Sequence, residues 1–459
     1  MKKQNRIAIL NISSTVLLRS ISLITTYLFS WLLGTSGTGV VSVYTTWVSV
    51  AAIVCTLQTN GSLVNARIEY PEEEQSRYQS SVMTLSLLFF LLCCGLVAIF
   101  IKPVTTLLKM PAMMVALLMW QAFGAFCVNF LNSKFTYEFK AGRNMILSVA
   151  AALSTMILSV ALILLMPENR RSFGRILGMA VTYGTLGVVG CVYVLGRGKT
   201  FFRPEYWKFC LTLALPVMFY NLSDLLLGHS DIVMVRHMAG DSAAGIYGVA
   251  FNFGNVMFTI FTALNNSWTP FFFEDMKQGR DVKPQAKNFL ELFTVLSIGF
   301  VLLTREVFHL YRREFWDGTV LVPIFVASYY LNFLCTFPIN FEYYHKKTKV
   351  VAAATVVSSL VNIALNYFFI LRFGMIGAAA ATLLSHCLQY SAHYLYCRYV
   401  LGKKRYPFGI RLWVPYAAIF LLAAAFSVLA SGLWPLRWGM GAALGIWELL
   451  RIRKRKVLL

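Results

Sequence analysis

The octapeptide LGTSGTGV at residues 33–40 has a counterpart in AGDSAAGI at residues 239–246. Both follow the pattern Gly-x-Ser-x-x-Gly-apolar, and each separates two long apolar runs. Gly and Ser are common in turns, so the shared letters alone could arise by coincidence. Because the two stretches also occupy matching positions among the apolar runs, we interpret them as the same turn in two copies of a six-helix repeat.

The apolar runs on either side of these turns are long enough to cross a membrane. A helix that spans ~30 Å of hydrocarbon needs about 20 residues. The sequence contains fourteen such runs. Because the last run is short, the alternative to fourteen spans is twelve spans followed by a loosely inserted terminal pair. The predicted spans are 7–33, 40–64, 81–101, 112–131, 145–166, 175–195, 209–235, 243–268, 288–308, 318–341, 350–371, 375–397, 412–432 and 437–450.

The composition supports lipid as the solvent. The chain of 459 residues is 58% hydrophobic and 13% charged, whereas soluble domains carry about 25% charged residues. So little charge could not cover a soluble surface. We therefore predict an all-α polytopic membrane protein of about fourteen transmembrane helices.

The positive charge has a membrane pattern. The 41 Lys and Arg exceed the 19 Asp and Glu, and they form short clusters between apolar runs, such as 403–405 and 451–456. Such clusters are typical of cytoplasmic loops that face anionic lipid headgroups, and they argue against nucleic acid as a partner. Most of the cations fall on the side of the N-terminus, which predicts that both termini are cytoplasmic and that the first run is a retained span.

A repeat of six helices gives both copies the same orientation. The expected domains are an N-terminal lobe at 1–208, a C-terminal lobe at 209–405 and a further helix pair with a basic tail at 406–459. Parallel repeats of this kind commonly place a substrate site between them, near the middle of the membrane. The architecture is typical of a two-lobed transporter.

Two ionisable residues lie at nearly equivalent depths in the repeat. Arg19 falls in the centre of the first span and Asp224 in the seventh. Charges in hydrocarbon are costly, so each is a candidate functional residue. Arg19 could meet an anionic substrate group, or the two could form a buried ion pair that holds the lobes together.

The seventh and eighth spans carry further polar residues. Asp231 could pair with His229 or Arg236, bind a coupling cation, or reach interfacial water; His229 alone could be structural. Asn252, Asn255 and Asn266 share one helical face, where they could line a wet cavity or form bonds between helices. In the twelfth span His386, Gln389 and His393 form a stripe, for which we expect helix-to-helix hydrogen bonding.

The sequence lacks the motifs of several enzyme classes. There is no GxxxxGK[ST] for ATP, no HExxH, no Asp-x-Asp pair, no CxxC and no Cys/His metal cluster. We expect neither a metal nor a cofactor. The predicted outer loops are too short to build a ligase or polymerase site, so transport driven by a gradient or by mass action remains.

Several short motifs resemble the second lobe of bacterial polysaccharide flippases. They are Leu215-Pro216, HSDIVMV at 229–235, GIYGVA at 245–250, NNSWTPFF at 265–272 and GMIGAAAAT at 374–382. The resemblance extends over essentially the whole chain and is strongest over 209–397. These O-antigen and capsule exporters share a superfamily with multidrug (MATE) exporters and the lipid II flippase.

The resemblance implies a flippase that moves an undecaprenyl-pyrophosphate-linked oligosaccharide from the inner to the outer leaflet of the bacterial cytoplasmic membrane. It also implies alternating access, and a polysaccharide polymerase and glycosyltransferases as partners. Arg19 matches the family's basic residue in the first span, and Asp231 its Asp before an apolar triplet. Ile232 departs from the basic residue that often follows. A second cation for the pyrophosphate is expected, with Arg67 and Arg236 as candidates.

Other functions remain open. A cation-coupled multidrug exporter or a lipid II flippase belongs to the same superfamily, and a membrane-embedded glycan polymerase or acyltransferase belongs to a different class. A drug exporter favours acidic residues in its cavity, so Arg19 argues against it. An enzyme would need a catalytic His or Asp on an outer loop.

Overall fold

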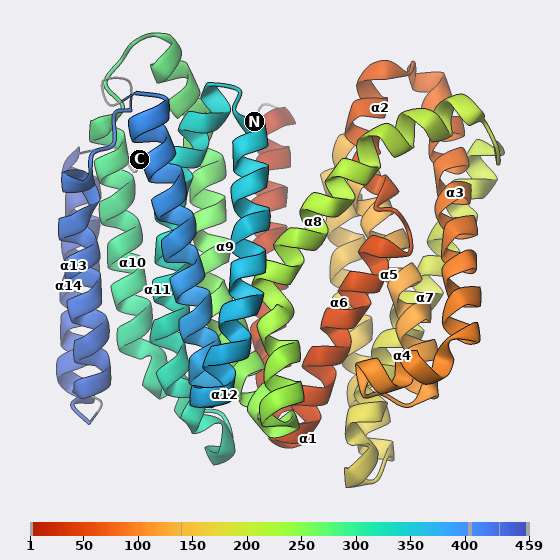
Figure 1. The fold of residues 1–459 in the computed structure, drawn as a ribbon, viewed down its shortest axis with the longest axis horizontal. Helices are drawn as coiled ribbons and strands as arrows, with labels where there is room; N and C mark the ends of the chain where they lie inside the picture. Colours follow the sequence, from red (N-terminus) through yellow and green to blue (C-terminus); the bar gives the residue numbers. More distant parts are fainter. Residues whose placement is uncertain (1–2, 139, 403–405, 431, 456–459) are drawn as a thin grey trace. The chain divides into compact units, whose positions relative to one another are not determined.

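The structure, a computed structural model, describes residues 3–138, 140–402, 406–430 and 432–455, with only the backbone of residues 3–16, 19, 224, 227, 452 and 454–455. The described residues are helical almost throughout and contain no strand (Figure 1). The all-α prediction is therefore confirmed. The chain divides into two compact units, Met1–Leu33 with Val40–Leu226, and Gly34–Gly39 with Leu227–Leu459.

The first unit is built from the helices of the N-terminal half. Their bounds are α1 (Lys3–Val54), η1 (Thr59–Ser62), α2 (Leu63–Glu69), α3 (Glu72–Ile99), α4 (Ile101–Leu108), α5 (Ala112–Tyr137), α6 (Ala141–Leu165), η2 (Glu168–Arg170), α7 (Arg171–Gly198) and the first part of α8 (Pro204–Ala239).

The second unit contains the remaining helices. After the end of α8 come α9 (Asp241–Lys277), α10 (Lys283–His309), η3 (Arg313–Val320), α11 (Leu321–Tyr344), α12 (Thr348–Leu395), η4 (Tyr396–Val400), α13 (Ile410–Leu429) and α14 (Trp434–Arg455).

Two of the helices each contain two of the predicted spans. α1 is kinked at Gly34 and α12 at Gly374, and both glycines have a positive φ, 66° and 57°. In the described part of the chain each of the fourteen predicted runs coincides for most of its length with helix, although the helix of the second run ends early, at Val54. Ten helices of the described chain are long and apolar enough to cross a membrane, or eleven if the broken α8 counts as one span.

In the first unit, α3, α5 and α6 all pack against α7. The contact between α5 and α7 is made by glycines. A Cβ added to Gly187 would lie 2.4 Å from the Cα of Gly124, so a larger residue cannot occupy this position without moving a helix. Small residues allow such close approach of helices in membranes, where packing rather than the hydrophobic effect drives association.

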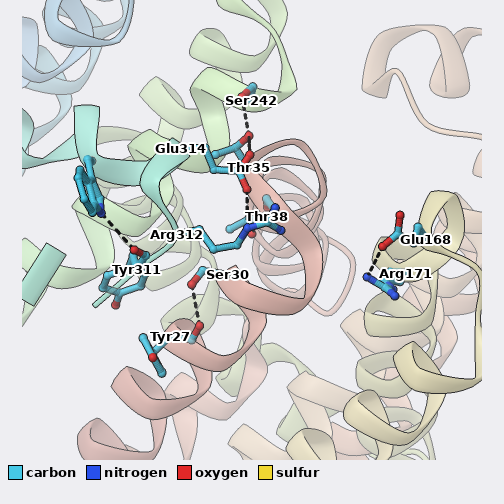
Figure 2. Close-up of polar contacts among 12 residues, drawn as sticks. Tyr27, Ser30, Thr35, Thr38, Glu168, Arg171, Ser242, Tyr311, Arg312 and Glu314 are labelled. Carbon is cyan, nitrogen blue, oxygen red and sulfur yellow. Dashed lines mark hydrogen bonds and ion pairs between the residues drawn. The ribbon is translucent and has the colours of Figure 1, made fainter. Parts of the chain in front are cut away.

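The turn Gly34–Gly39 belongs to the second unit, where it packs beside its counterpart in the repeat. Gly34 (φ 66°, ψ −175°) and Gly240 (φ 93°, ψ 171°) adopt nearly the same backbone conformation, which L side chains rarely reach. Figure 2 shows Thr35 between two polar partners: its Oγ1 accepts from Ser242 Oγ at 2.7 Å and donates to Glu314 Oε2 at 3.4 Å. These contacts support the repeat inferred from the sequence.

The C-terminal helices α13 and α14 pack along α10. At one end Arg437 donates to the carbonyl of Leu302 at 2.8 Å and forms an ion pair with Glu306. At the other end Arg451 pairs with both Glu291 and Glu448. The hairpin is therefore attached to α10 by an ion pair near each end.

Candidate functional site

The first unit contains a cavity of about 550 Å³, formed by α1, α5, α6 and α7. Its lining combines polar and apolar side chains and is almost uncharged. Hydroxyl groups come from both halves of α1, amides come from α5, and the described lining residues include one cation and no carboxylate. The polar lining includes Ser22, Thr26, Thr45, Gln121, Asn129, Asn132 and Arg175.

Arg175 is the cation of this cavity. Its Nη1 donates to Ser159 Oγ at 2.8 Å, and its guanidinium lies 3.8 Å from the ring centroid of Phe29. A guanidinium held by a hydroxyl and an aromatic face keeps its positive charge and retains donors for a further acceptor. Arg175 therefore gives the cavity a fixed positive charge that can meet an anionic ligand.

The sequence prediction missed Arg175. Arg175 is the first residue of the predicted span 175–195 and lies close in sequence to Arg170 and Arg171. A cation at the end of a span is typical of the membrane interface. The structure instead directs the side chain along α6, toward Ser159 and the carbonyl of Thr155. No spacing in the sequence signals that direction.

Two polar atoms of the cavity have no partner among the described residues. Gln121 Oε1 and Thr155 Oγ1 are buried and accept no recorded hydrogen bond. A buried polar atom without a partner costs about 1–3 kcal/mol. Neither atom is exposed to the cavity, so a donor in the cavity would reach them only after a local side-chain movement.

The side chains of Arg19 and Asp224 lie outside the described residues, so the proposed pairing of these two residues stays a prediction. Arg19 belongs to α1, the helix that also supplies Leu18, Ile21 and Ser22 to the cavity.

Asp231 is at the centre of a buried polar cluster in the second unit. Its side chain is 1% exposed and accepts hydrogen bonds from Tyr247 Oη and from Thr382 Oγ1, the latter at 3.2 Å. Asn362 donates from Nδ2 to Thr382 Oγ1 at 3.4 Å. Its Oδ1 accepts from Asn366 Nδ2 at 3.0 Å. Three helices, α8, α9 and α12, thus contribute to one network.

The expected charge partners of Asp231 are elsewhere. His229 packs its ring against Phe251 at 5.1 Å. Arg236 donates from Nε to Asp241 Oδ1 at 2.6 Å. The polar contacts recorded for Asp231 come instead from hydroxyls and from the amide of Ile232. Carboxylate, hydroxyl and amide oxygens are the ligands that hard cations prefer, and the described residues hold no cluster of three or more His, Cys, Asp or Glu suited to a metal.

The amides of α9 do not gather at a described cavity. Asn252 and Asn266 are exposed and Asn255 is half-buried, and none of the three makes a recorded side-chain hydrogen bond. Their neighbour Asn265 instead accepts from Asn340 Nδ2 of α11 at 2.9 Å.

The histidine stripe of α12 bonds partly across helices. His393 Nδ1 lies 2.9 Å from Glu342 Oε2 of α11, and both side chains are fully buried. His386 instead contacts Gln389 on its own helix at 3.4 Å.

The two candidates for a second cation are both near carboxylates. Arg67 lies 3.6 Å from Glu72, and Arg236 pairs with Asp241. Neither lines the cavity of the first unit.

A comparison with known protein families assigns the chain to one of them. The sequence model of the family described as "Polysaccharide biosynthesis protein" matches residues 6–276, which is more than half of the chain. The chain belongs to this polysaccharide biosynthesis protein family. The matched region includes every residue that lines the cavity.

Curated relatives of this family member match over part of their length. A Haemophilus influenzae protein of the Lsg locus is 23% identical over 199 residues, which cover 40% of this chain and 49% of that protein. An uncharacterized membrane protein of the same organism is 22% identical over 151 residues, 32% of this chain and 37% of that protein. The chain thus spans about half, or less, of the length of these relatives.

Solved structures show the same fold at low identity. The lipid II flippase MurJ in an inward closed conformation aligns with a TM-score of 0.72 and 15% identity, over 98% of this chain and 100% of that one. An inward-facing multidrug resistance MATE transporter of the MOP superfamily aligns with a TM-score of 0.64 and 12% identity, over 85% and 97%. This family member therefore shares the fold of these structures, and the long apolar helices of its described residues identify it as a multi-pass membrane protein.

Proposed function

We propose that the chain is a flippase that moves an undecaprenyl-pyrophosphate-linked oligosaccharide from the inner to the outer leaflet by alternating access. The observation that carries the proposal is the polar cavity of the first unit, with Arg175 as its cation. Membership of the polysaccharide biosynthesis family supports a glycan as the cargo.

The cavity has the chemistry that a saccharide requires. Sugar hydroxyls both donate and accept, so they match the amides Gln121, Asn129 and Asn132 and the hydroxyls that surround them. Gln121 Oε1 and Thr155 Oγ1 are buried without a partner, and a rotation of either side chain toward the cavity would let it accept from a sugar hydroxyl. An anionic group on the same substrate would lie against the guanidinium of Arg175.

Further residues are assigned by proposal. Arg19 would meet the pyrophosphate, with Asp224 as its partner in the absence of substrate, while Asn252, Asn255 and Asn266 would face the transport route. Asp231, with His229 nearby, would hold a coupling cation through the hydroxyl and amide oxygens around it. The expected lobes 1–208 and 209–405 would alternate the access of the site to the two leaflets.

The cellular setting follows from the same proposal. The protein would lie in the bacterial cytoplasmic membrane with both termini in the cytoplasm, which agrees with the excess of Lys and Arg on that side. It would receive its substrate from glycosyltransferases and deliver it to a polysaccharide polymerase of the O-antigen or capsule type.

A cation-coupled drug exporter is the second candidate within the superfamily. Such an exporter favours acidic groups for cationic drugs, and the described lining of the cavity carries a guanidinium and no carboxylate. A lipid II flippase differs in cargo, and the cavity chemistry does not separate it from the leading proposal.

The deciding experiment is deletion of the gene and complementation with Arg19→Ala. Under the proposal, the deletion strain accumulates lipid-linked repeat units on the cytoplasmic face and loses surface polymer, and the Arg19→Ala protein inserts normally without restoring the polymer. Normal polymer display by that variant would remove Arg19 from the mechanism. A deletion strain that displays polymer normally but loses efflux of a labelled drug would replace the proposal with the exporter.

A further inference from the structure

A second cavity, of about 270 Å³, lies in the second unit between α10, η3, the start of α11 and the α13–α14 hairpin. One wall is apolar and includes Val301, Pro323 and Val428. The lining also includes Arg305 and Arg437. The described lining residues include no Asp or Glu, so the polar side of this cavity is cationic.

The two arginines differ in how their charges are balanced. Arg437 is 1% exposed, and its charge is matched by the ion pair with Glu306 outside the lining. Arg305 is half-buried, and the described residues provide it with no recorded hydrogen bond or ion pair. One positive charge in the lining is therefore not balanced by a protein carboxylate.

Aromatic groups fix the level of this cavity relative to a membrane. The rings of His309 and Trp316 lie edge to face with their centroids 4.3 Å apart, and both residues line the cavity. The indole of Trp316 donates to the carbonyl of Tyr311 at 3.1 Å, which holds it in place. A Trp at the end of a membrane-spanning helix typically lies at the headgroup level. The cavity is thus positioned for lipid headgroups rather than for the hydrocarbon core.

We propose that this cavity binds a phosphate-ester headgroup of an anionic lipid. The phosphate oxygens would lie against the fork of Arg305, because guanidinium matches phosphate geometry. The first carbons of the lipid would lie along Val301, Pro323 and Val428. The volume of about 270 Å³ is sufficient for a phosphate group and a glycerol.

The phosphate could come from two kinds of lipid. A phospholipid such as phosphatidylglycerol would make the site a binding site for membrane lipid. Undecaprenyl phosphate would tie it to the carrier used in glycan assembly. The shared chemistry is a phosphate ester next to an apolar chain, and the proposal does not depend on the cargo of the transporter.

The test is native mass spectrometry of the purified full-length protein with phosphatidylglycerol, phosphatidylcholine of the same acyl chains, or undecaprenyl phosphate. We expect the wild-type protein to prefer an anionic lipid to phosphatidylcholine. Arg305→Gln should weaken its binding about tenfold, equivalent to about 1.4 kcal/mol. The matched control is Arg313→Gln, which removes the same charge from an exposed residue of η3 outside the cavity.

A second variant separates the cavity from general surface charge. Val428→Phe adds volume to the apolar wall and leaves every charge in place, so it should also weaken anionic lipid binding while the thermal midpoint stays within a few degrees of wild type. Preference for phosphatidylglycerol identifies a membrane lipid as the ligand, and preference for undecaprenyl phosphate identifies the carrier. Either result supports the proposal if Arg305→Gln and Val428→Phe both lose that preference. Equal binding of all three lipids, or an unchanged preference in Arg305→Gln and Val428→Phe, would overturn it.

Discussion

Gly39 and Gly245 contact each other's turn in a reciprocal way. A Cβ added to Gly39 would lie 1.9 Å from the carbonyl oxygen of Asp241, and a Cβ added to Gly245 would lie 1.9 Å from the carbonyl oxygen of Thr35. Thr35 and Gly39 occupy the same positions of the repeat as Asp241 and Gly245. The two turns are therefore related by approximate two-fold symmetry, in which each glycine receives the other turn's backbone.

The reciprocal contact predicts that Gly245→Val strongly destabilises the protein. The new side chain would meet backbone, which cannot rotate away, so the cost should be at or above the 1–3 kcal/mol typical of overpacking. Thermal unfolding of the purified protein in detergent measures the effect. Gly299→Ala is the control, since a Cβ there meets open space. A Gly245→Val protein as stable as this control would contradict the close contact.

Arg175→Gln should reduce surface polymer at least tenfold without loss of membrane insertion. The substitution removes the charge of the cavity but keeps a donor for Ser159. Polymer can be measured with a glycan-specific antibody, and insertion by immunoblot of the membrane fraction. Arg170→Gln, an exposed residue outside the cavity, should retain full export. Equal export by the two variants would exclude a role for the Arg175 charge.

Tyr247→Phe should destabilise the protein by about 1–3 kcal/mol, because it removes a donor to the buried carboxylate of Asp231. Asp231→Asn in the Tyr247→Phe background should cost less than in wild type, because the two residues belong to one network. Unfolding measurements on the two single variants and the double variant give the interaction energy. Strictly additive losses would show that the hydroxyl and the carboxylate act independently.

His393→Phe should cost about 1–3 kcal/mol, because it removes a hydrogen-bond partner of the fully buried carboxyl group of Glu342. His393→Gln, which can still donate to Glu342, should be milder. His386→Phe is a useful comparison, since His386 contacts Gln389 of its own helix and should cost less. Thermal or denaturant unfolding ranks the three variants, and a His393→Phe protein no weaker than His386→Phe would refute the importance of the cross-helix pair.

Much of the fold could be predicted from the sequence because lipid imposes simple rules. The length of an apolar run sets a span, and a glycine that must adopt a positive φ sets a turn. Gly34 and Gly240 could thus be matched across the chain from the sequence alone. The end of the second span at Val54 was missed because the apolar sequence continues into a left-handed turn at Leu57 and Gln58.

The candidate site was harder to predict, because it depends on where side chains point. Asp231 was recognisable as an ionisable residue in a span, but its partners Tyr247 and Thr382 come from two other helices and carry no charge. Arg175 could not be recognised as a cavity residue, because a cation at the end of a span is common and carries no functional signal. The amides of α9 share a face in sequence, yet it is Asn265, off that face, that bonds to another helix.

The ion pairs of the C-terminal hairpin limit how the chain can be shortened. Glu306 and Glu291 of α10 are paired with Arg437 and Arg451, both on α14. A twelve-helix version that ended before α13 would leave two carboxylates on α10 facing lipid without a cation. Such a truncation would be tolerated only with compensating substitutions at Glu291 and Glu306. In related proteins that gain or lose the last two helices, we therefore expect these positions of α10 to change together with the hairpin.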